Sequence, residues 1–292
     1  MASNRILVLG GTGQVGFELV RAFSLLGDVR APSRIELDLT SELAVSNFLD
    51  QFQPSLILNA AAYTAVDKAE SEPVLADRLN HLLPAQLSNW SAKHSAKLVH
   101  YSSDYVYPGN GRHAWIETDL TAPCNEYGRT KLKGDQAVES SGCMYLIFRT
   151  SWVYSARGHN FMKTMLALGK ERTSLKVVYD QVGAPTPARL IALVTLQACL
   201  KSVTSGTYHL APRGEVSWHG FAQAIFKFAA VAGINLAITP DAVEPIPSSD
   251  YPTPAQRPQN SRLNLTQLES ALNCELPSWQ SQLQLTIEEY LL

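Results

Sequence analysis

The chain carries a tyrosine and a lysine at a spacing that suits proton transfer. Tyr127 and Lys131 stand four residues apart, so in a helix over residues 127–140 they share one face. A positive charge beside a phenol favours its ionised form, which would let Tyr127 exchange a proton at neutral pH despite a reference pKa of about 10. The Ser103 hydroxyl, expected at the end of a preceding strand, could hold a substrate oxygen against the phenol. The pair alone is weak evidence, because most such pairs are surface residues on a helix.

The order of motifs along the chain supports a catalytic role for Tyr127 and Lys131. An apolar run over residues 6–9 predicts a strand buried on both faces of a parallel sheet, and an amphipathic segment over residues 17–26 predicts a helix. The turn between them spaces its glycines so that the backbone can approach a pyrophosphate at a helix N-terminus. The residues predicted to bind the phosphates are Gly10, Gly13, Gln14, Val15 and Gly16.

The region after the second strand bears on which nicotinamide cofactor is used. A carboxylate that binds the adenosine ribose is expected about 20 residues after the glycines begin. The strand over residues 28–31 is followed by no acid, and Arg34 could instead face a 2′-phosphate. This favours NADPH, with NADH also possible, although a solvent-exposed loop arginine is the alternative. Asp38 is placed to reach an adenine amino group, and Leu39 beside it is expected at the same site.

Two further strand ends are expected at the carboxyl edge of the sheet, where open α/β folds bind ligands. The strand over residues 55–59 runs into Ala60, Ala61, Ala62 and Tyr63, whose small alanines leave room for a flat cofactor. Tight packing of a helix on the sheet explains the alanines equally well. The strand over residues 97–103 ends in two serines.

The remaining pattern predicts an α/β fold, with a doubly wound parallel Rossmann-type sheet and a smaller α/β substrate lobe. Strands near residues 177 and 207 are expected to complete the sheet. Thr186 is expected to cap a helix that has Pro187 at its first position. The dinucleotide-binding domain is expected at residues 1–150 and 177–211, and the smaller substrate lobe at residues 152–176 and 212–292. Other helices are expected at residues 41–51, 66–95, 162–168, 218–231 and 278–290.

Composition narrows the class of protein. The net charge of -2 gives no reason to expect a nucleic-acid partner. No apolar run approaches the roughly 20 residues needed to cross a bilayer, and a first strand beginning at Arg5 leaves no room for a signal peptide. The four cysteines are scattered without metal-ligand spacing. We therefore expect a cytoplasmic protein with free thiols and no membrane partner.

Over essentially its whole length the chain resembles the extended short-chain dehydrogenase/reductases and, within them, the dTDP-4-dehydrorhamnose reductases. The broad resemblance rests on the glycine turn, residues 59–62, Ser103, and Tyr127 with Lys131. The narrower one rests on residues 61–70, 102–107, 149–154, 180–186 and 257–261. It implies NADPH- or NADH-dependent reduction of the 4-keto group of dTDP-6-deoxy-L-lyxo-4-hexulose to dTDP-L-rhamnose, the last step of its synthesis, by a monomer or homodimer.

The resemblance also implies roles for single residues. Tyr127 is expected to protonate the C4 oxygen, and Lys131 to hold the nicotinamide ribose and favour the tyrosinate. Ser103 would hydrogen-bond the carbonyl oxygen, where the family usually has threonine. The sugar pocket is expected to include Asp104, Tyr105 and Trp152, although Trp152 is also readable as a core aromatic.

Two positions depart from the family pattern. Some members hold magnesium at a dimer contact with carboxylates soon after the Gly-Ala-Pro-Thr turn, but this chain has Pro187, Ala188 and Arg189 there, so no metal is expected. Glu126 precedes the tyrosine, where it either raises the pKa of Tyr127 or faces solvent.

Two rival functions remain open at this point. One is another nucleotide-sugar reductase, epimerase or dehydratase of the same superfamily. A dehydratase generally needs an acid/base pair here, but Ser103 is followed by Asp104 and Tyr105. The other is a non-catalytic regulatory subunit resembling that of methionine adenosyltransferase.

Overall fold

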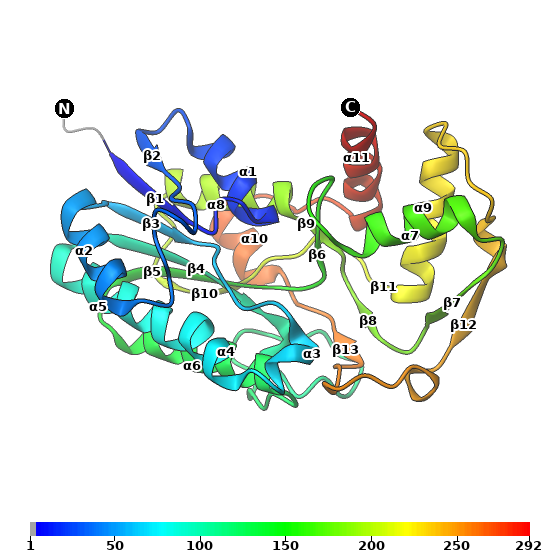
Figure 1. The fold of residues 1–292 in the computed structure, drawn as a ribbon, viewed down its shortest axis with the longest axis horizontal. Coiled ribbons are helices and arrows are strands. Elements are labelled where there is room, and N and C mark those ends of the chain that lie inside the picture. Colours follow the sequence, from blue (N-terminus) through cyan, green and yellow to red (C-terminus); the bar gives the residue numbers. More distant parts are fainter. Residues whose placement is uncertain (1–3) are drawn as a thin grey trace.

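The computed structural model describes residues 4–292 and is built on one parallel sheet of six strands (Figure 1). The strands lie in the order β10-β5-β4-β3-β1-β2, so the chain begins near one edge and crosses to the other. All pairs in this sheet are parallel. Its members are β1 (Arg5–Leu9), β2 (Asp28–Arg30), β3 (Leu56–Asn59), β4 (Lys97–Ser103), β5 (Met144–Thr150) and β10 (Gly206–His209).

Helices cover both faces of this sheet, which confirms the predicted doubly wound fold (Figure 1). One face packs against α1 (Gln14–Phe23), α8 (Ala188–Leu200) and α10 (Thr266–Leu272). The other packs against α2 (Glu42–Phe52), α5 (Leu83–His94) and α6 (Glu126–Ser140). Strand side chains alternate between the two cores: Ile6 and Val8 enter the first, and Leu7 and Leu9 the second.

The expected helix over residues 66–95 is divided into four pieces. These are α3 (Val66–Ala69), α4 (Pro73–Asp77), a π-helical turn (Arg78–Leu82) and α5, which has Pro84 in its first turn. Proline is tolerated there because the first amides of a helix have no partner within it. The π-turn matters for the site because it carries the buried Asn80.

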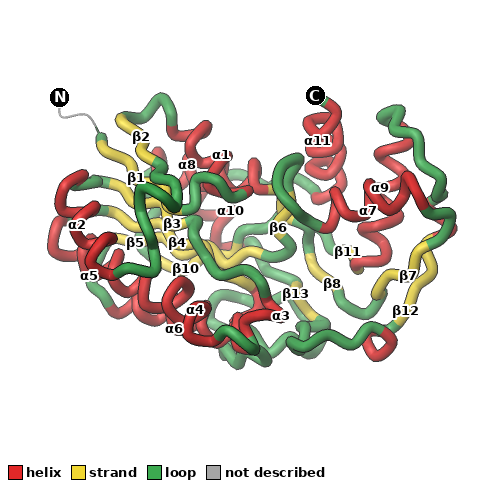
Figure 2. Tube along the Cα trace, in the orientation of Figure 1, coloured by secondary structure: helices red, strands yellow, loops and turns green. Residues whose placement is uncertain are grey.

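The smaller lobe lies beyond the carboxyl edge of the sheet (Figure 2). Its core gathers α7 (Phe161–Glu171), α9 (Trp218–Val231) and α11 (Trp279–Leu291) around buried Met162, Phe221 and Leu283. Short paired strands lie in and beside this lobe: β7 (Leu175–Val178) with β12 (Val243–Ile246), β8 (Val182–Gly183) between β11 (Val216–Ser217) and β13 (Asn260–Ser261), and β6 (Val153–Tyr154) with β9 (Thr186–Pro187).

Two local predictions were wrong. The strand near residue 177 is β7, which pairs with β12 outside the main sheet. Thr186 does not cap α8; it lies in β9, where its hydroxyl donates to the Ala184 carbonyl at 3.1 Å. Pro187 is extended, with ψ at 140°, so α8 begins at Ala188.

Among residues 4–292, no helix combines the length and apolar character needed to span a bilayer.

Candidate active site

The parallel register brings several predicted site residues to one edge of the sheet. Leu9 at the end of β1 pairs with Asn59 of β3, and Asn59 pairs with His100 of β4. The glycine turn after β1, the alanines after β3 and Ser103 at the end of β4 therefore leave the sheet on the same side.

The glycine turn is shaped to accept a phosphate. Helix α1 begins at Gln14, and its N-cap, Gly13, offers no side-chain oxygen to the first-turn amides. A Cβ on Gly16 would lie 2.1 Å from the Gly10 carbonyl oxygen, so only glycine lets the helix start this close to the turn. Free amides at a helix N-terminus bind anions, and the turn therefore fits the diphosphate of a dinucleotide.

The side chain of Gln14 reaches away from the turn to the smaller lobe. Its Oε1 accepts hydrogen bonds from Ser155 Oγ at 3.0 Å and from Asn160 Nδ2 at 2.8 Å. Beside it, the Arg157 guanidinium lies 3.9 Å from the centre of the Phe17 ring. The loop before α7 thus lies against the start of α1.

The residues predicted for the adenosine end occupy the loop after β2. Arg34 is exposed there, and Leu39 packs against the sheet core. Asp38 is also exposed, and its Oδ1 accepts from the amide and the hydroxyl of Thr40 at 2.9 and 2.7 Å. These hydrogen bonds lower the pKa of Asp38.

Asn80 joins the segment after β3 to helix α6. Its Oδ1 accepts from the Tyr63 amide at 2.8 Å, and its Nδ2 donates to the Tyr63 carbonyl and to Thr130 Oγ1, each at 3.1 Å. The Tyr63 hydroxyl donates to Glu72 Oε2 at 2.6 Å, which raises the pKa of Tyr63 to about 12. The partly buried Ala60, Ala61 and Ala62 are thereby anchored to the helix that carries Tyr127.

Helix α6 is capped and packed so that Tyr127 lies in its first turn beside the end of β4. Asn125 caps the helix by accepting from the Gly128 amide at 2.8 Å. A Cβ on Gly128 would lie 2.3 Å from the Tyr105 carbonyl oxygen, so glycine allows this close approach. The rings of Tyr127 and Tyr105 meet edge to face with centroids 5.5 Å apart.

Burial is the largest influence on the pKa of Tyr127 in this structure. Burial raises the pKa of Tyr127 above its ordinary value, and the nearby Ser103 hydroxyl only partly opposes this. The Ser103 hydroxyl itself donates to Asp104 Oδ1 at 3.0 Å and accepts from the Tyr105 amide at 3.2 Å. The raised pKa favours the protonated form of Tyr127.

Lys131 is turned toward the sheet rather than toward solvent. Only 1% of it is exposed, and its Nζ donates to the Tyr101 carbonyl at 2.6 Å. Burial lowers the pKa of Lys131 to about 8, and Asp135 opposes that shift. Sequence reasoning missed His100 and Asp135, because both lie in segments that read as ordinary strand and helix.

Of the predicted sugar-pocket residues, Asp104 is the most deeply buried polar one. Asp104 is buried, which raises its pKa to about 6. Its Oδ2 and the hydroxyl of Ser261 in β13 make no hydrogen bond of normal geometry among the described residues, but Ser261 lies near enough to lower the pKa of Asp104. Trp152 is half-buried, has φ of 49° and stacks on Trp218 with ring centroids 3.7 Å apart.

The proline-rich segment over residues 251–258 lies against the same region. Arg257 Nη2 donates to Asp67 Oδ2 at 2.7 Å, and its Nη1 is 3.5 Å from the Tyr105 hydroxyl. Asn125, the cap of α6, donates to the Gln256 carbonyl at 2.7 Å. From the sequence, Arg257 is notable only as part of the segment over residues 257–261, and no contact is predicted for it.

Glu126 takes neither of the two roles considered for it. Its Oε2 accepts from Arg129 Nε at 2.8 Å, so it forms a partly exposed ion pair within the first turns of α6. The charges that raise the pKa of Tyr127 are those of Asp104, Tyr105 and Asp135.

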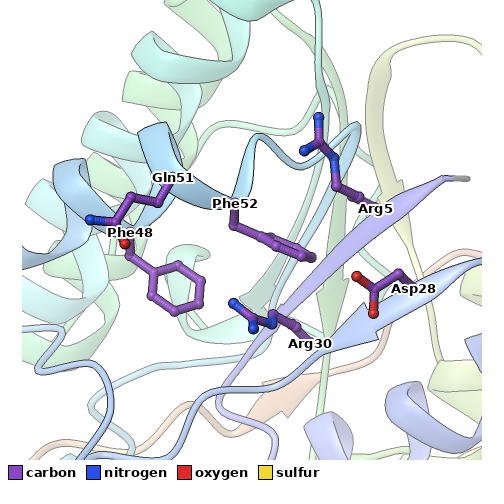
Figure 3. Close-up of a pocket in the computed structure, with 6 residues that line it drawn as sticks. All are labelled: Arg5, Asp28, Arg30, Phe48, Gln51 and Phe52. Atoms are coloured by element: carbon purple, nitrogen blue, oxygen red, sulfur yellow. The ribbon is translucent and has the colours of Figure 1, made fainter. Parts of the chain in front are cut away.

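A separate groove of about 280 Å³ opens where β1 and β2 begin and α2 ends (Figure 3). Its six lining residues are Arg5, Asp28, Arg30, Phe48, Gln51 and Phe52. It lies away from the carboxyl ends of the strands, and none of the chemistry described above involves it.

The chain is similar to known proteins over almost its whole length. The family model described as RmlD substrate binding domain matches residues 4–292. The chain belongs to this family. The dTDP-4-dehydrorhamnose reductase of Shigella flexneri is 46% identical over 283 residues, which is 94% of each chain.

Solved structures agree with the relatives in sequence. A dTDP-4-dehydrorhamnose reductase from Clostridium acetobutylicum superimposes with a TM-score of 0.90 at 34% identity, covering 99% of this chain and 100% of that one. The enzyme of the same name from Bacillus anthracis, solved in complex with NADP, has a TM-score of 0.90 at 33% identity and covers 98% and 99%.

Proposed function

We propose that this chain is an NADPH-dependent dTDP-4-dehydrorhamnose reductase, which reduces the 4-keto group of dTDP-4-dehydro-6-deoxy-L-mannose to give dTDP-L-rhamnose. The observation that carries the proposal is the placement of Tyr127, with its proton, beside Ser103 at the sheet edge that also holds the glycine turn. Membership in the family and the names of its relatives support the choice of substrate.

Some of the predicted site residues would bind the cofactor, and others would take part in proton transfer. The turn over Gly10, Gly13, Gln14, Val15 and Gly16 would hold the diphosphate, with the loop around Arg34, Asp38 and Leu39 at the adenosine and Ala60 to Tyr63 along the nicotinamide half. When bound there, NADPH supplies the hydride. NADH remains a second possible cofactor.

The proton comes from the protein. As C4 of the sugar gains hydrogen and its C4–O double bond becomes single, Tyr127 gives its proton to the oxygen and is left as phenolate. Ser103 would hydrogen-bond that oxygen, and Lys131 would stabilise the phenolate and hold the nicotinamide ribose. Asp104, Tyr105 and Trp152 would line the sugar pocket.

The wider assignments are also proposals. The lobe built around the six-stranded sheet would bind the dinucleotide, and the lobe around α7, α9 and α11 the nucleotide sugar. The four free cysteines support a reducing cytoplasm as the compartment. A monomeric or homodimeric state, and the lack of a nucleic-acid partner, stay predictions.

One assay separates this function from its rivals. Loss of reduced-nicotinamide absorbance is followed with NADPH and the 4-keto sugar nucleotide, and again with dTDP-glucose, which has no ketone to reduce. We expect oxidation only with the ketone, and dTDP-L-rhamnose as the product by NMR.

The rival functions give different results in the same assay. An epimerase would change sugar stereochemistry without net loss of NADPH. A regulatory subunit would bind NADPH and oxidise none of it. Either result overturns the proposal.

A further inference from the structure

The charge on Lys131 is buried without a neighbouring carboxylate. Its Nζ has the Tyr101 carbonyl at 2.6 Å and His100 Nε2 at 3.4 Å. Between residues 4 and 292, no Asp or Glu oxygen lies within the 4.0 Å of Nζ that would make an ion pair. Removing an ammonium from water is costly unless another charge compensates it, so the source of compensation must be sought further away.

Asp135 is placed to supply that compensation. It follows Lys131 by four residues on α6, so the two side chains share a face of the helix, and its carboxylate is fully buried. Its Oδ2 accepts from Ser102 Oγ at 2.9 Å and from Arg149 Nε at 3.0 Å. Its Oδ1 has no hydrogen-bond partner and lies 3.8 Å from His100 Nε2. Oδ2 therefore accepts two hydrogen bonds, whereas Oδ1 accepts none and faces the His100 imidazole.

His100 separates the two charges and is itself neutral. Burial and the charge of Lys131 lower the pKa of His100 well below its ordinary value. Asn59 Nδ2 lies 3.2 Å from His100 Nδ1, and His100 Nε2 has both Lys131 Nζ, at 3.4 Å, and Asp135 Oδ1, at 3.8 Å, beside it. The ammonium and the carboxylate thus approach the same nitrogen of a buried, neutral ring.

The other groups around Asp135 favour its ionised form. Arg149 of β5 pairs with it directly, and the Arg149 and Lys131 charges oppose the burial that raises the pKa of Asp135. Behind Arg149, the Tyr107 hydroxyl accepts from Nη1 at 2.9 Å and lies 2.6 Å from Nε2 of a buried, neutral His209. Glu117 accepts from the His209 amide at 2.9 Å. On the helix itself, the charge of Asp135 also raises the pKa of Tyr127. The other charged side chains of α6 have partners of their own: Glu126 pairs with Arg129, Lys133 with Asp77, and Glu139 accepts from Thr207.

We propose that Asp135, acting across neutral His100, is the counter-charge that keeps Lys131 protonated in the cofactor cleft, and is thus a positioning residue for the reduction. This inference rests on the proposed role of Lys131 toward the nicotinamide ribose and Tyr127. It does not depend on which sugar nucleotide is the substrate.

The test compares Asp135→Asn with the native enzyme across pH. Asparagine keeps the shape and can still accept from Ser102 or Arg149, but it removes the charge. Loss of an opposite charge at this range lowers the pKa of Lys131, so the pH at which kcat/KM declines on the alkaline side should fall by about one unit. At a pH below that decline, kcat should stay within about threefold of the native value, since Lys131 is then charged in both proteins.

A second readout uses no sugar nucleotide. NADPH binding is titrated by fluorescence over the same pH range, and its affinity should begin to weaken about one unit lower in Asp135→Asn. Because the titration needs only the cofactor, it still reports on Lys131 if the substrate has been misassigned.

Two matched variants distinguish charge from structure. Asp135→Glu keeps the charge and should restore the native pH dependence. Ser102→Ala removes a hydrogen bond from the same carboxylate, so it should lower the melting temperature while leaving the alkaline decline in place. If Asp135→Asn does not fold, Asp135→Asn with Arg149→Gln removes both charges of the pair and should show the same shift, because Asp135 is the charge that supports Lys131. An alkaline decline that stays at the native pH in the neutral variants, or that moves equally in Ser102→Ala, overturns the proposal.

Discussion

At the scale of single residues, the proposed proton transfer depends on the electrostatic surroundings of Tyr127 and Lys131. The spacing of Tyr127 and Lys131 predicts a shared helix face, and α6 provides it. It does not predict that Lys131 bonds to the Tyr101 carbonyl or that burial raises the pKa of Tyr127. Those properties depend on how deeply the two side chains are buried, which cannot be read from a spacing.

Replacing Tyr127 with phenylalanine tests the proton donor. The ring is kept and the proton is lost, so kcat should fall by at least about 10²-fold, the lower end of what general acid catalysis contributes. The dissociation constant for NADPH should change little, because the hydroxyl is not expected to hold the cofactor. Tyr179→Phe, at an exposed tyrosine, is the matched control and should keep native turnover. Near-native turnover in Tyr127→Phe would reject the assignment and leave Asp104 as the next candidate acid.

Replacing Arg34 with alanine tests the choice of cofactor. Arg34 is exposed in the loop after β2, and a guanidinium on a 2′-phosphate in such a place is expected to change affinity on the order of tenfold. The KM for NADPH should therefore rise by that factor while the KM for NADH stays the same. Arg172→Ala, at an exposed arginine after α7, should alter neither. An equal effect on both cofactors, or none on either, would show that Arg34 is only a loop residue.

The raised pKa of Asp104 predicts a specific dependence of the free energy of unfolding on pH. Its pKa is raised from 3.8 to about 6 in the folded protein, so the folded state binds more protons than the unfolded state between these values. The free energy of unfolding therefore falls as pH rises through this window, by about 3 kcal/mol for a shift of this size. Asp104→Asn should match the native stability near pH 4 and exceed it by up to that amount above pH 7 in urea denaturation.

An exposed carboxylate provides the comparison. Asp241→Asn should follow the native protein at every pH. A stability difference between Asp104→Asn and the native protein that does not change with pH would argue against a raised pKa for Asp104.

At the scale of elements, periodicity predicted the sheet and most helices because those segments bury regular apolar faces. Pairing over long distances was harder to predict. The partner of β7 is β12, which begins at Val243, far along the chain from the end of β7 at Val178. Strand β12 also contains Pro245, and a proline in a sequence argues against a strand. Thr186 and Pro187 have the composition of a helix start, yet the β6–β9 contact holds them extended.

Helix α6 depends on Gly128 for its close approach to β4. Gly128→Ala would place a methyl group 2.3 Å from the Tyr105 carbonyl oxygen, and backbone cannot yield as a flexible side chain can. We expect a loss of about 1–3 kcal/mol in unfolding free energy, together with reduced kcat because Tyr127 is displaced from Ser103. Gly206→Ala in β10 meets only the Tyr208 ring, at 3.4 Å or more, and should keep native turnover. Full activity in Gly128→Ala would mean that the helix can shift without cost to the site.

At the scale of the whole molecule, metal dependence can be tested, because the sequence departs from the magnesium-binding pattern of some family members at Pro187, Ala188 and Arg189. These residues form the end of β9 and the start of α8, and they offer no carboxylate for magnesium. Dialysis against a chelator should therefore leave both turnover and the mass measured by light scattering unchanged, and added magnesium should restore nothing. Loss of activity or dissociation on chelation, reversed by magnesium, would show that this chain holds the ion with other residues.

The division into two lobes is interleaved along the chain, and this has a consequence for how the molecule is made. After β5 the chain leaves the sheet, forms α7 and β7, and returns only for α8 and the edge strand β10. On the ribosome, where synthesis proceeds from the N-terminus, the part of α1 that packs on α8 stays uncovered until α8 has emerged. Strand β7 likewise waits for β12. Neither lobe can finish folding before the other has begun, so neither is expected to fold from a gene fragment expressed alone.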